Sequence, residues 1–416
     1  MKIHVVLLFT LLAITGSYAQ KESNNWLFGT NVWLDFSSGT PVSVSGSAMN
    51  VAEGCASFSD TSGNLLFYTD GITIWDKTHN PMPNGTGMHG NNSSSQSTIV
   101  VPKPGSNYTN FYVFTVDADP GNLIAPVYYG FEYSEIDMTL NGGNGDVTAV
   151  KNVHLIDSVS EKVTAVRSGI NGNNFWVITH EWNTNRFFSY EVTATGVNTI
   201  PVISSVGSVH LQGNGGFLTV PSHGYLKATK NGDRLALAIG NTVNKVEIFN
   251  FNNTNGQVSS PVSMTMRDVY GLEFSPSGQY LYTALSTNPD TIFQFDVTAP
   301  NIPITKLTAG VTTSGTIIKA IQIANNGKIY CAQGGLNSLS VINNPDQPAP
   351  ACNFVLNAIP LNSACKSGLP NFFTNIFLNA DYIYADTCLN APTQFTLQYA
   401  AGPDSVHWNF DDPGSG

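Results

Sequence analysis

The stretch Leu272–Tyr282, LEFSPSGQYLY, decides the fold of this chain. Two apolar runs flank a Ser-Pro-Ser-Gly turn, which is the pattern of two short antiparallel strands joined by a tight turn. Related phrases occur at Phe58–Tyr68, Leu226–Leu235 and Ile321–Tyr330, with a looser copy at Gly169–Val177. Repetition at this scale indicates one small β-unit used several times.

The spacing of the copies predicts a β-propeller. The turn glycines Gly232, Gly278 and Gly327 follow one another at intervals just under about 50 residues, as propeller blades do. Six complete units run from Ala52 to Ile342. Two remnants, Trp26–Phe36 and Gly368–Phe373, can build one more sheet, in which the N-terminal strands complete a blade begun by the C-terminal one. We therefore predict an all-β, seven-bladed propeller over residues 20–380, with six blades as the alternative.

The first 19 residues have the pattern of a signal peptide. Lys2 supplies the positive charge, Val5–Ile14 is apolar, and Ser17–Ala19 offers small residues for cleavage. The apolar run is too short to span a bilayer. We expect a secreted or cell-surface protein with no membrane span in the mature chain.

The composition narrows the classes of partner. Hydrophobic residues make up 42% of the chain and charged residues only 11%, with a net charge of −11. A nucleic-acid-binding protein normally needs a basic face, so nucleic acid is not an expected partner.

Five cysteines in an exported protein suggest disulfide bonds. Cys352 and Cys365 flank a short Pro/Asn-rich loop, and we predict a disulfide between them. Cys55 and Cys331 are interpreted as small buried side chains within strands. Cys388 is left over and could pair beyond the sequence.

The repeat pattern stops near residue 380. Residues 381–392 are interpreted as a linker, and residues 393–416 as the beginning of a further, incomplete domain. The stretch Asp404–Gly416, DSVHWNFDDPGSG, is similar to a motif of PKD domains, which are immunoglobulin-like β-sandwiches of surface proteins. One departure is Asp411, where the family usually has glycine.

The propeller region resembles the N-terminal part of large secreted Bacteroidetes proteins that carry PKD domains and a type IX (gliding-motility-associated) sorting domain. The resemblance rests on phrases in the order Asn25–Gly29, Gly63–Gly71, Met82–Gly87, Ser97–Pro102, Tyr270–Ser275, Gly327–Tyr330 and Gly368–Phe372. It implies export by the type IX route and brings no established catalytic residues.

Candidate sites are few. Asp117, Asp119 and Asn122 place oxygen ligands at nearly alternate positions and are a weak Ca²⁺ candidate, although a solvated turn explains them as well. The loop Asn80–Ser97 is the longest irregular segment and a candidate for recognition. No other cofactor is expected.

The remaining polar and aromatic motifs are interpreted as structural. His180 and Glu181 are adjacent, so in a strand they face opposite sides. The other histidines show no zinc-ligand spacing, and the tryptophans lie on or beside strands, where packing between blades explains them: His79, His89, His154, His210, His223, Trp26, Trp33, Trp75, Trp176 and Trp182.

We therefore expect a non-catalytic binding or adhesion scaffold that presents propeller loops to extracellular glycans or proteins. The alternative is a propeller hydrolase or lyase that processes glycans. Acidic and aromatic side chains that converge on the propeller axis would favour the enzyme, whereas an axis lined by Gly, Ser and apolar groups would oppose it.

Overall fold

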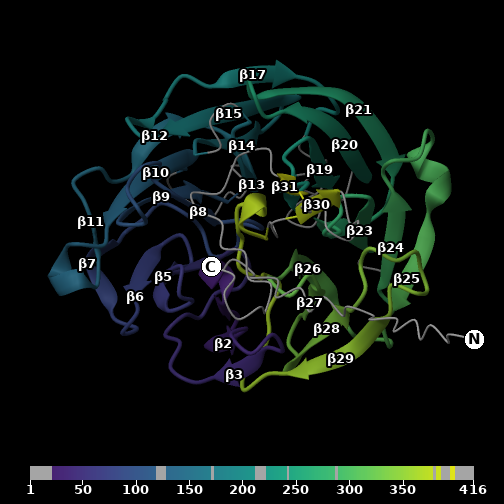
Figure 1. Ribbon diagram of the computed structural model, residues 1–416, viewed down its shortest axis with the longest axis horizontal. Coiled ribbons are helices and arrows are strands. Elements are labelled where there is room, and N and C mark those ends of the chain that lie inside the picture. Colours follow the sequence, from purple (N-terminus) through teal and green to yellow (C-terminus); the bar gives the residue numbers. More distant parts are fainter. Residues whose placement is uncertain are drawn as a thin grey trace, which may run out of the picture.

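Seven antiparallel sheets follow one another along the described chain and stand around a common axis in the computed structural model (Figure 1). The structure describes residues 21–118, 128–169, 173–210, 222–240, 243–285, 289–377, 381–385 and 394–398. The predicted signal peptide, Asp119, Asn122, Cys388 and the PKD-like motif lie outside these residues.

The first four blades use residues 25–205. The first blade has β1 (Asn25–Phe28), β2 (Val32–Asp35) and β3 (Val42–Val44), and the second has β4 (Ala56–Ser59), β5 (Leu65–Thr69), β6 (Thr73–Asp76) and β7 (Pro81–Thr86). The third has β8 (Thr98–Pro102), β9 (Asn110–Val116), β10 (Phe131–Asp137), β11 (Asp146–Val147) and β12 (Val153–Ile156). The fourth has β13 (Val159–Arg167), β14 (Phe175–Glu181), β15 (Arg186–Thr193), β16 (Gly196–Val197) and β17 (Val202–Ser205).

The last three blades are regular four-stranded meanders. The fifth has β18 (Leu226–Ala228), β19 (Arg234–Ile239), β20 (Lys245–Asn252) and β21 (Gln257–Thr265). The sixth has β22 (Val269–Phe274), β23 (Tyr280–Leu285), β24 (Thr291–Asp296) and β25 (Leu307–Val311). The seventh has β26 (Ile318–Ile323), β27 (Ile329–Gln333), β28 (Ser338–Ile342) and β29 (Phe354–Pro360).

Helix is almost absent from the described residues, as the alternating pattern predicts. It is limited to four short 3-10 turns: η1 (Lys21–Ser23), η2 (Asn141–Gly143), η3 (Ile302–Thr305) and η4 (Thr374–Phe377). No helix in this part of the chain is long and apolar enough to cross a membrane. After the propeller, β30 (Asp381–Ala385) pairs with β31 (Gln394–Gln398), so a strand occupies the start of the segment interpreted as a linker.

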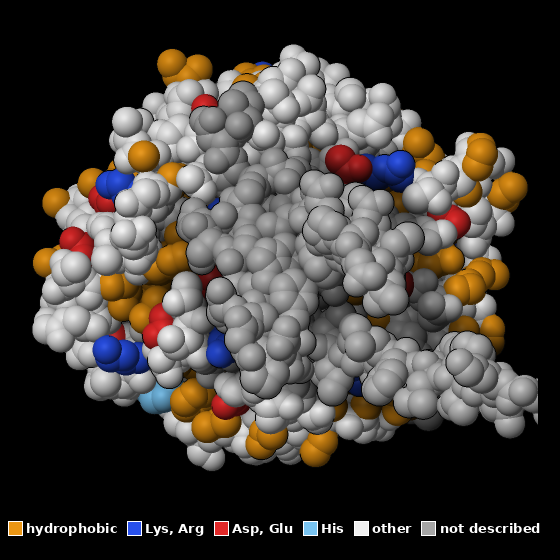
Figure 2. Space-filling model, in the orientation of Figure 1, with side chains coloured by type: hydrophobic (Ala, Val, Ile, Leu, Met, Phe, Trp, Pro, Cys, Tyr) orange, Lys and Arg blue, Asp and Glu red, His pale blue; other side chains and the backbone are white. Residues whose placement is uncertain are grey.

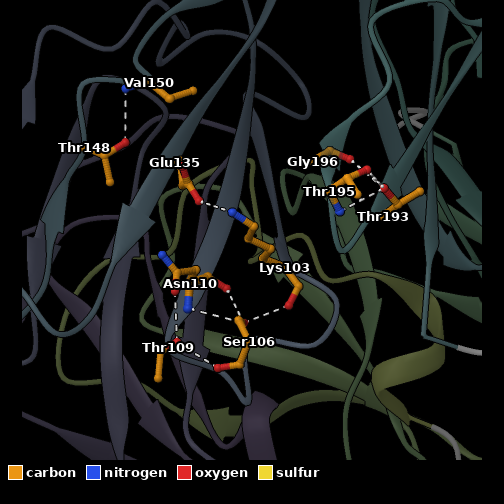
Figure 3. Close-up of polar contacts among 10 residues, drawn as sticks. All are labelled: Lys103, Ser106, Thr109, Asn110, Glu135, Thr148, Val150, Thr193, Thr195 and Gly196. Carbon is orange, nitrogen blue, oxygen red and sulfur yellow. Dashed lines mark hydrogen bonds and ion pairs between the residues drawn. The ribbon is translucent and has the colours of Figure 1, made fainter.

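The repeated phrase forms the first hairpin of a blade. In the sixth blade, Leu281 pairs with Phe274 across the Ser-Pro-Ser-Gly turn, and Gly278 takes a positive φ of 74° there. Both strands of this hairpin are fully buried. The last strand of each blade lies at the periphery, as β17, β21, β25 and β29 show (Figure 1). The turns are fixed by local hydrogen bonds. After β8, for example, Ser106 donates to the carbonyls of Lys103 and Asn110, while Lys103 pairs with Glu135 on β10 at 2.9 Å (Figure 3).

The ring closes between the two ends of the propeller, which confirms seven blades rather than six. β3 lies beside β29 (Figure 1), and the Ser43 hydroxyl donates to the Pro360 carbonyl at 3.1 Å. The Thr30 amide donates to the Ala364 carbonyl at 3.0 Å. The first blade, however, has three strands in register, all N-terminal. The C-terminal segment from Gly368 forms only isolated parallel bridges, to Cys55 and Val100.

That C-terminal segment, residues 367–373, passes into the centre of the propeller. Asn371 donates from its side chain to the carbonyls of Thr98 and Val163, at 3.3 and 3.1 Å, and accepts from Gln96 at 3.3 Å. Phe372 packs near Trp26 of the first blade. The segment therefore joins blades that are distant in sequence, which explains why the chain needs its C-terminal residues to close the fold.

Candidate functional site

Backbone hydrogen bonds link the starts of the inner strands. The Gly54 amide donates to Ser94 at 2.9 Å, and the Tyr225 amide donates to Tyr270 at 3.0 Å. The C-terminal segment links the seventh blade to the second through Ser367. The Ser367 carbonyl accepts from the Ala320 amide, and the Ser367 amide donates to the Ala52 carbonyl. We call these strand starts the inner ring: residues 52–55, 94–97, 160–163, 224–226, 270–271, 319–320 and 367–368.

Close backbone approach at the inner ring requires glycine. A Cβ atom on Gly368 would lie 1.7 Å from the Glu53 carbonyl oxygen, and one on Gly271 would lie 2.0 Å from the Lys319 carbonyl oxygen. Any side chain at either position would displace a neighbouring strand. The spacing between strands at the ring is therefore fixed by the sequence.

Bulges at the ring turn polar side chains away from the regular packing of the blades. The register shifts between Val159 and Val163, between Val269 and Leu272, and between Ile318 and Ile321. The residues inserted there include Glu161, Tyr270 and Lys319. Bulges commonly re-aim a side chain next to a functional site, because the extra residue leaves the alternation of the strand.

Two glutamates lie close together at the ring. The Tyr270 hydroxyl donates to Glu53 Oε2 at 2.9 Å. Glu161 accepts from both the amide and the hydroxyl of Ser95, at 3.0 and 3.1 Å on Oε2, while His223 Nε2 lies 3.5 Å from Oε1. Lys319 Nζ stands 5.1 Å from the centre of the Tyr270 ring. We call these six residues the two-glutamate cluster: Glu53, Ser95, Glu161, His223, Tyr270 and Lys319.

The two carboxyl groups have different environments. Burial raises the pKa of Glu53 to about 8, and the negative charge of Glu161 adds to the rise. The hydrogen bond from Tyr270 and the charge of Lys319 oppose it. Glu53 is therefore mostly protonated at neutral pH. The Glu161 side chain is only 2% exposed, but His223 beside it is 36% exposed, so the cluster reaches solvent.

This arrangement is suited to acid–base chemistry. A protonated carboxyl can donate a proton or a hydrogen bond, and an oriented carboxylate can accept a proton from water. A buried carboxyl group with a raised pKa, next to a second carboxyl group, is a recurring form of enzyme active site.

Of the candidates chosen from the sequence, only the loop Asn80–Ser97 contributes to the cluster, through Ser95. His223 was interpreted as structural. Asp117 accepts backbone N–H groups from Ala118 and Tyr129. Its predicted partners in the Ca²⁺ site lie outside the described residues, so calcium binding stays a prediction. In the described part of the chain no group of three His, Cys, Asp or Glu is placed to hold a metal ion.

The other histidines are spread over several blades. His79 bonds to the Tyr68 hydroxyl at 3.1 Å, and His89 bonds to Glu132 at 2.8 Å. His154 lies between Glu132 and Asp157. His180 is buried against His210, while the adjacent Glu181 pairs with Arg186, so the two neighbours face opposite sides as predicted.

The predicted disulfide between Cys352 and Cys365 is not formed in the structure, where both are buried free cysteines. Cys352 packs in the core cluster that contains Cys331, whereas Cys365 belongs to the large cluster that contains Cys55. The loop between them therefore leads from one core to another instead of returning to its start. Cys55 and Cys331 are buried, as the sequence predicted.

The loop at residues 80–97 is less irregular than expected, because Pro81–Thr86 forms β7, the outer strand of the second blade. Its last residues, Ser94–Ser97, are fully buried at the inner ring. Trp26, Trp176 and Trp182 are buried in blade packing, while Trp33 and Trp75 are partly buried. On the part of the surface that Figure 2 colours by side-chain type, Lys and Arg are scattered among Asp and Glu, with no large area of one charge.

Comparison with known proteins supports the fold. A 6-phosphogluconolactonase of Bacteroides fragilis, so named provisionally, is 15% identical, and the match covers 83% of this chain and 97% of that one with a TM-score of 0.51. The Swd1 β-propeller domain of Myceliophteria thermophila Cps50 is 10% identical over 77% of this chain and 95% of that one, with a TM-score of 0.42. The periplasmic gluconolactonase of Pseudomonas aeruginosa is 11% identical over 82% of each chain, with a TM-score of 0.42. No family model and no curated protein matches the sequence.

Proposed function

We propose that this protein is a hydrolase that uses the two-glutamate cluster for general acid–base catalysis on a sugar-derived substrate. The observation that carries the proposal is the pairing of a protonated Glu53 with an oriented Glu161 at the inner ring. The sequence alone favoured a non-catalytic scaffold. Acidic and aromatic side chains near the propeller axis favour an enzyme instead, and Glu53, Glu161 and Tyr270 are such side chains.

In the proposed reaction Glu161 is the general base. Its carboxylate is held by Ser95 on one oxygen and approached by His223 on the other. It would take a proton from water as the water attacks the substrate. Glu53 is the general acid and would give its proton to the oxygen that leaves, with Tyr270 holding it in place. Lys319 supplies positive charge near the developing negative charge.

We choose a sugar lactone as the first substrate to test. The cluster can act on an ester or a glycosidic bond, because both need a base for water and an acid for the leaving oxygen. The Bacteroides fragilis neighbour shares the fold alone at 15% identity, so its name guides only the order of the screen.

The experiment is a turnover screen with the full chain on δ-lactones of aldonic acids and on aryl glycosides, measured above the spontaneous rate. E161Q and E53Q should each lower kcat by roughly 10²–10⁴-fold, the usual contribution of a general acid or base. E135Q is the matched control, since Glu135 pairs with Lys103 away from the ring. Turnover that survives both cluster substitutions, or no turnover of any lactone or glycoside, would overturn the proposal.

The localisation also remains a proposal. We infer export to the cell surface or medium from the N-terminal pattern, and the type IX route from the family resemblance. Proteolytic shaving of intact cells, followed by detection of the chain in the released fraction or in the medium, tests this. Retention inside cells would contradict it.

A further inference from the structure

Two imidazole rings stack inside the fourth blade. His180 lies on β14 and His210 follows β17, and their ring centres are 3.6 Å apart with an angle of 12° between the planes. Both residues are 0% exposed. The Phe187 ring meets His180 edge-on at 4.8 Å. The pair is therefore closed off from bulk water in the structure.

None of the four ring nitrogens makes a well-formed hydrogen bond in the structure. The hydroxyl of the buried Ser222 also has no partner. Leaving a buried polar group unsatisfied costs roughly 1–3 kcal/mol, so buried groups nearly always have a partner in the protein or in a bound species. Four such atoms in one stacked pair of rings point to a bound species.

The surroundings of the pair are electropositive. Lys162 is fully buried, and its ammonium donates to the Ser222 carbonyl. The pKa of His180 falls to about 3, first because of burial and then because of the Lys162 charge, and the backbone of Glu181 offsets this only in part. Burial, His180 and Lys162 also lower the pKa of His210. Both rings are neutral at pH 7, and each then keeps one N–H donor.

The stacked geometry selects the kind of ligand. The lone pair of an imidazole nitrogen lies in the plane of its ring, so two parallel rings 3.6 Å apart cannot both direct a lone pair at one metal ion. A hydrogen bond tolerates more bending. One acceptor between the ring edges can therefore receive an N–H from each ring.

We propose that His180 and His210 bind a small inorganic anion, chloride being the physiological example, near the charge of Lys162. The neighbouring Glu161 carboxylate is engaged by Ser95 and His223. The anion would accept the ring N–H groups of His180 and His210, which have no hydrogen-bond partner in the structure. The inference does not depend on the proposed hydrolase activity.

Bromide provides the direct test, because it replaces chloride and scatters anomalously. Crystals of the full chain grown in sodium bromide should show an anomalous peak beside the His180–His210 stack. In solution, chloride should raise Tm by roughly 2–4 °C over the same ionic strength of gluconate, an anion too large for the site. H180F and H210F should lose this difference, whereas H154F, at a histidine that is 47% exposed, should keep it.

The crystal experiment uses the unmodified protein, so it decides the question even if a variant fails to fold. A peak at the stack, together with a chloride effect lost in H210F, supports the proposal. Water in place of an anomalous peak, or the same Tm in chloride and gluconate, would overturn it.

Discussion

Glu53 and Tyr270 are joined by a 2.9 Å hydrogen bond, although 217 residues separate them in the chain. Glu53 precedes the inner strand of the second blade, and Tyr270 lies on that of the sixth. Only closure of the propeller brings them together. Through this hydrogen bond, the pKa of Glu53, the proposed acid, depends on a residue from another blade.

The Tyr270 hydroxyl stabilises the charged form of Glu53, since its hydrogen bond lowers the pKa of that carboxyl. Y270F should therefore raise the pKa of Glu53 further above about 8, by roughly one unit if a bond of about 1.5 kcal/mol is lost. Glu53 would stay protonated to a higher pH, so the alkaline fall in kcat/KM should move to higher pH. Y133F, in the third blade, should leave the profile unchanged. An alkaline limb that does not move in Y270F would contradict the assignment of Glu53 as the acid.

Glu53 should also make the stability of the fold depend on alkaline pH. Its pKa in the folded protein, about 8, lies above the ordinary value of 4.5, so the folded state holds the proton more tightly than the unfolded state. The resulting stability is fully present below pH 4.5 and is lost as the pH rises through about 8.

E53Q cannot ionise and should therefore lose less stability between pH 6 and pH 9 than the unmodified chain does. Urea unfolding at the two pH values measures this difference. E135Q should behave like the unmodified chain. Equal losses in E53Q and the unmodified protein would show that Glu53 ionises as readily when folded as when unfolded.

Much of the fold could be predicted because the inner strands carry a strong signal. In β22 all six residues are buried, and the turn before β23 uses a glycine with positive φ. The outer strands were missed. In β21 only two of nine residues are buried, so solvent-facing residues of mixed type hide the alternation. The prediction that the C-terminal remnant shares a blade with the N-terminal strands was wrong, because the segment forms single bridges to Cys55 and Val100 instead. Its path into the centre depends on Asn371, whose partners lie more than 200 residues away in sequence.

The site could not be found from sequence patterns, because its six residues come from six different blades and follow no motif spacing. Glu53 and Glu161 each stand two residues before a buried residue of an inner strand, which is a weak signal in a chain with 11% charged residues. Tyr270 begins the stretch Tyr270–Ser275, which contributed to the family resemblance and not to any predicted site. What gives these residues their chemistry is the bulged start of each inner strand, which appears only when the sheets are in register.

Asn371 should be one of the most sensitive polar positions in the fold. It is 2% exposed and bonds to Gln96 and Thr98 at the start of the third blade and to Val163 in the fourth. N371A would leave buried groups without partners and should cost about 2–4 kcal/mol of unfolding free energy.

N362A is a matched control nine residues earlier in the chain, because Asn362 is exposed and its side chain bonds to the Val44 carbonyl at 2.8 Å. It should cost less than about 1 kcal/mol. Chemical unfolding of both variants under one set of conditions gives the comparison. Similar losses in the two would mean that Asn371 does not hold the centre of the propeller.

Lys227 and Glu273 form a buried ion pair between the inner strands of the fifth and sixth blades, with 3.3 Å between Nζ and Oε2. Each side chain is 3% exposed. Burial raises the pKa of Glu273, and the charge of Lys227 opposes that rise. K227M should therefore cost about 3–5 kcal/mol, because it leaves Glu273 without its cation.

The double variant K227M/E273L removes both charges and should recover most of that loss, since an apolar pair of similar volume replaces the ion pair. Urea unfolding of the single and double variants at pH 7 measures the difference. A double variant no more stable than K227M would show that the single loss arises from lost packing around the long lysine side chain. The unpaired charge of Glu273 would then not be its cause.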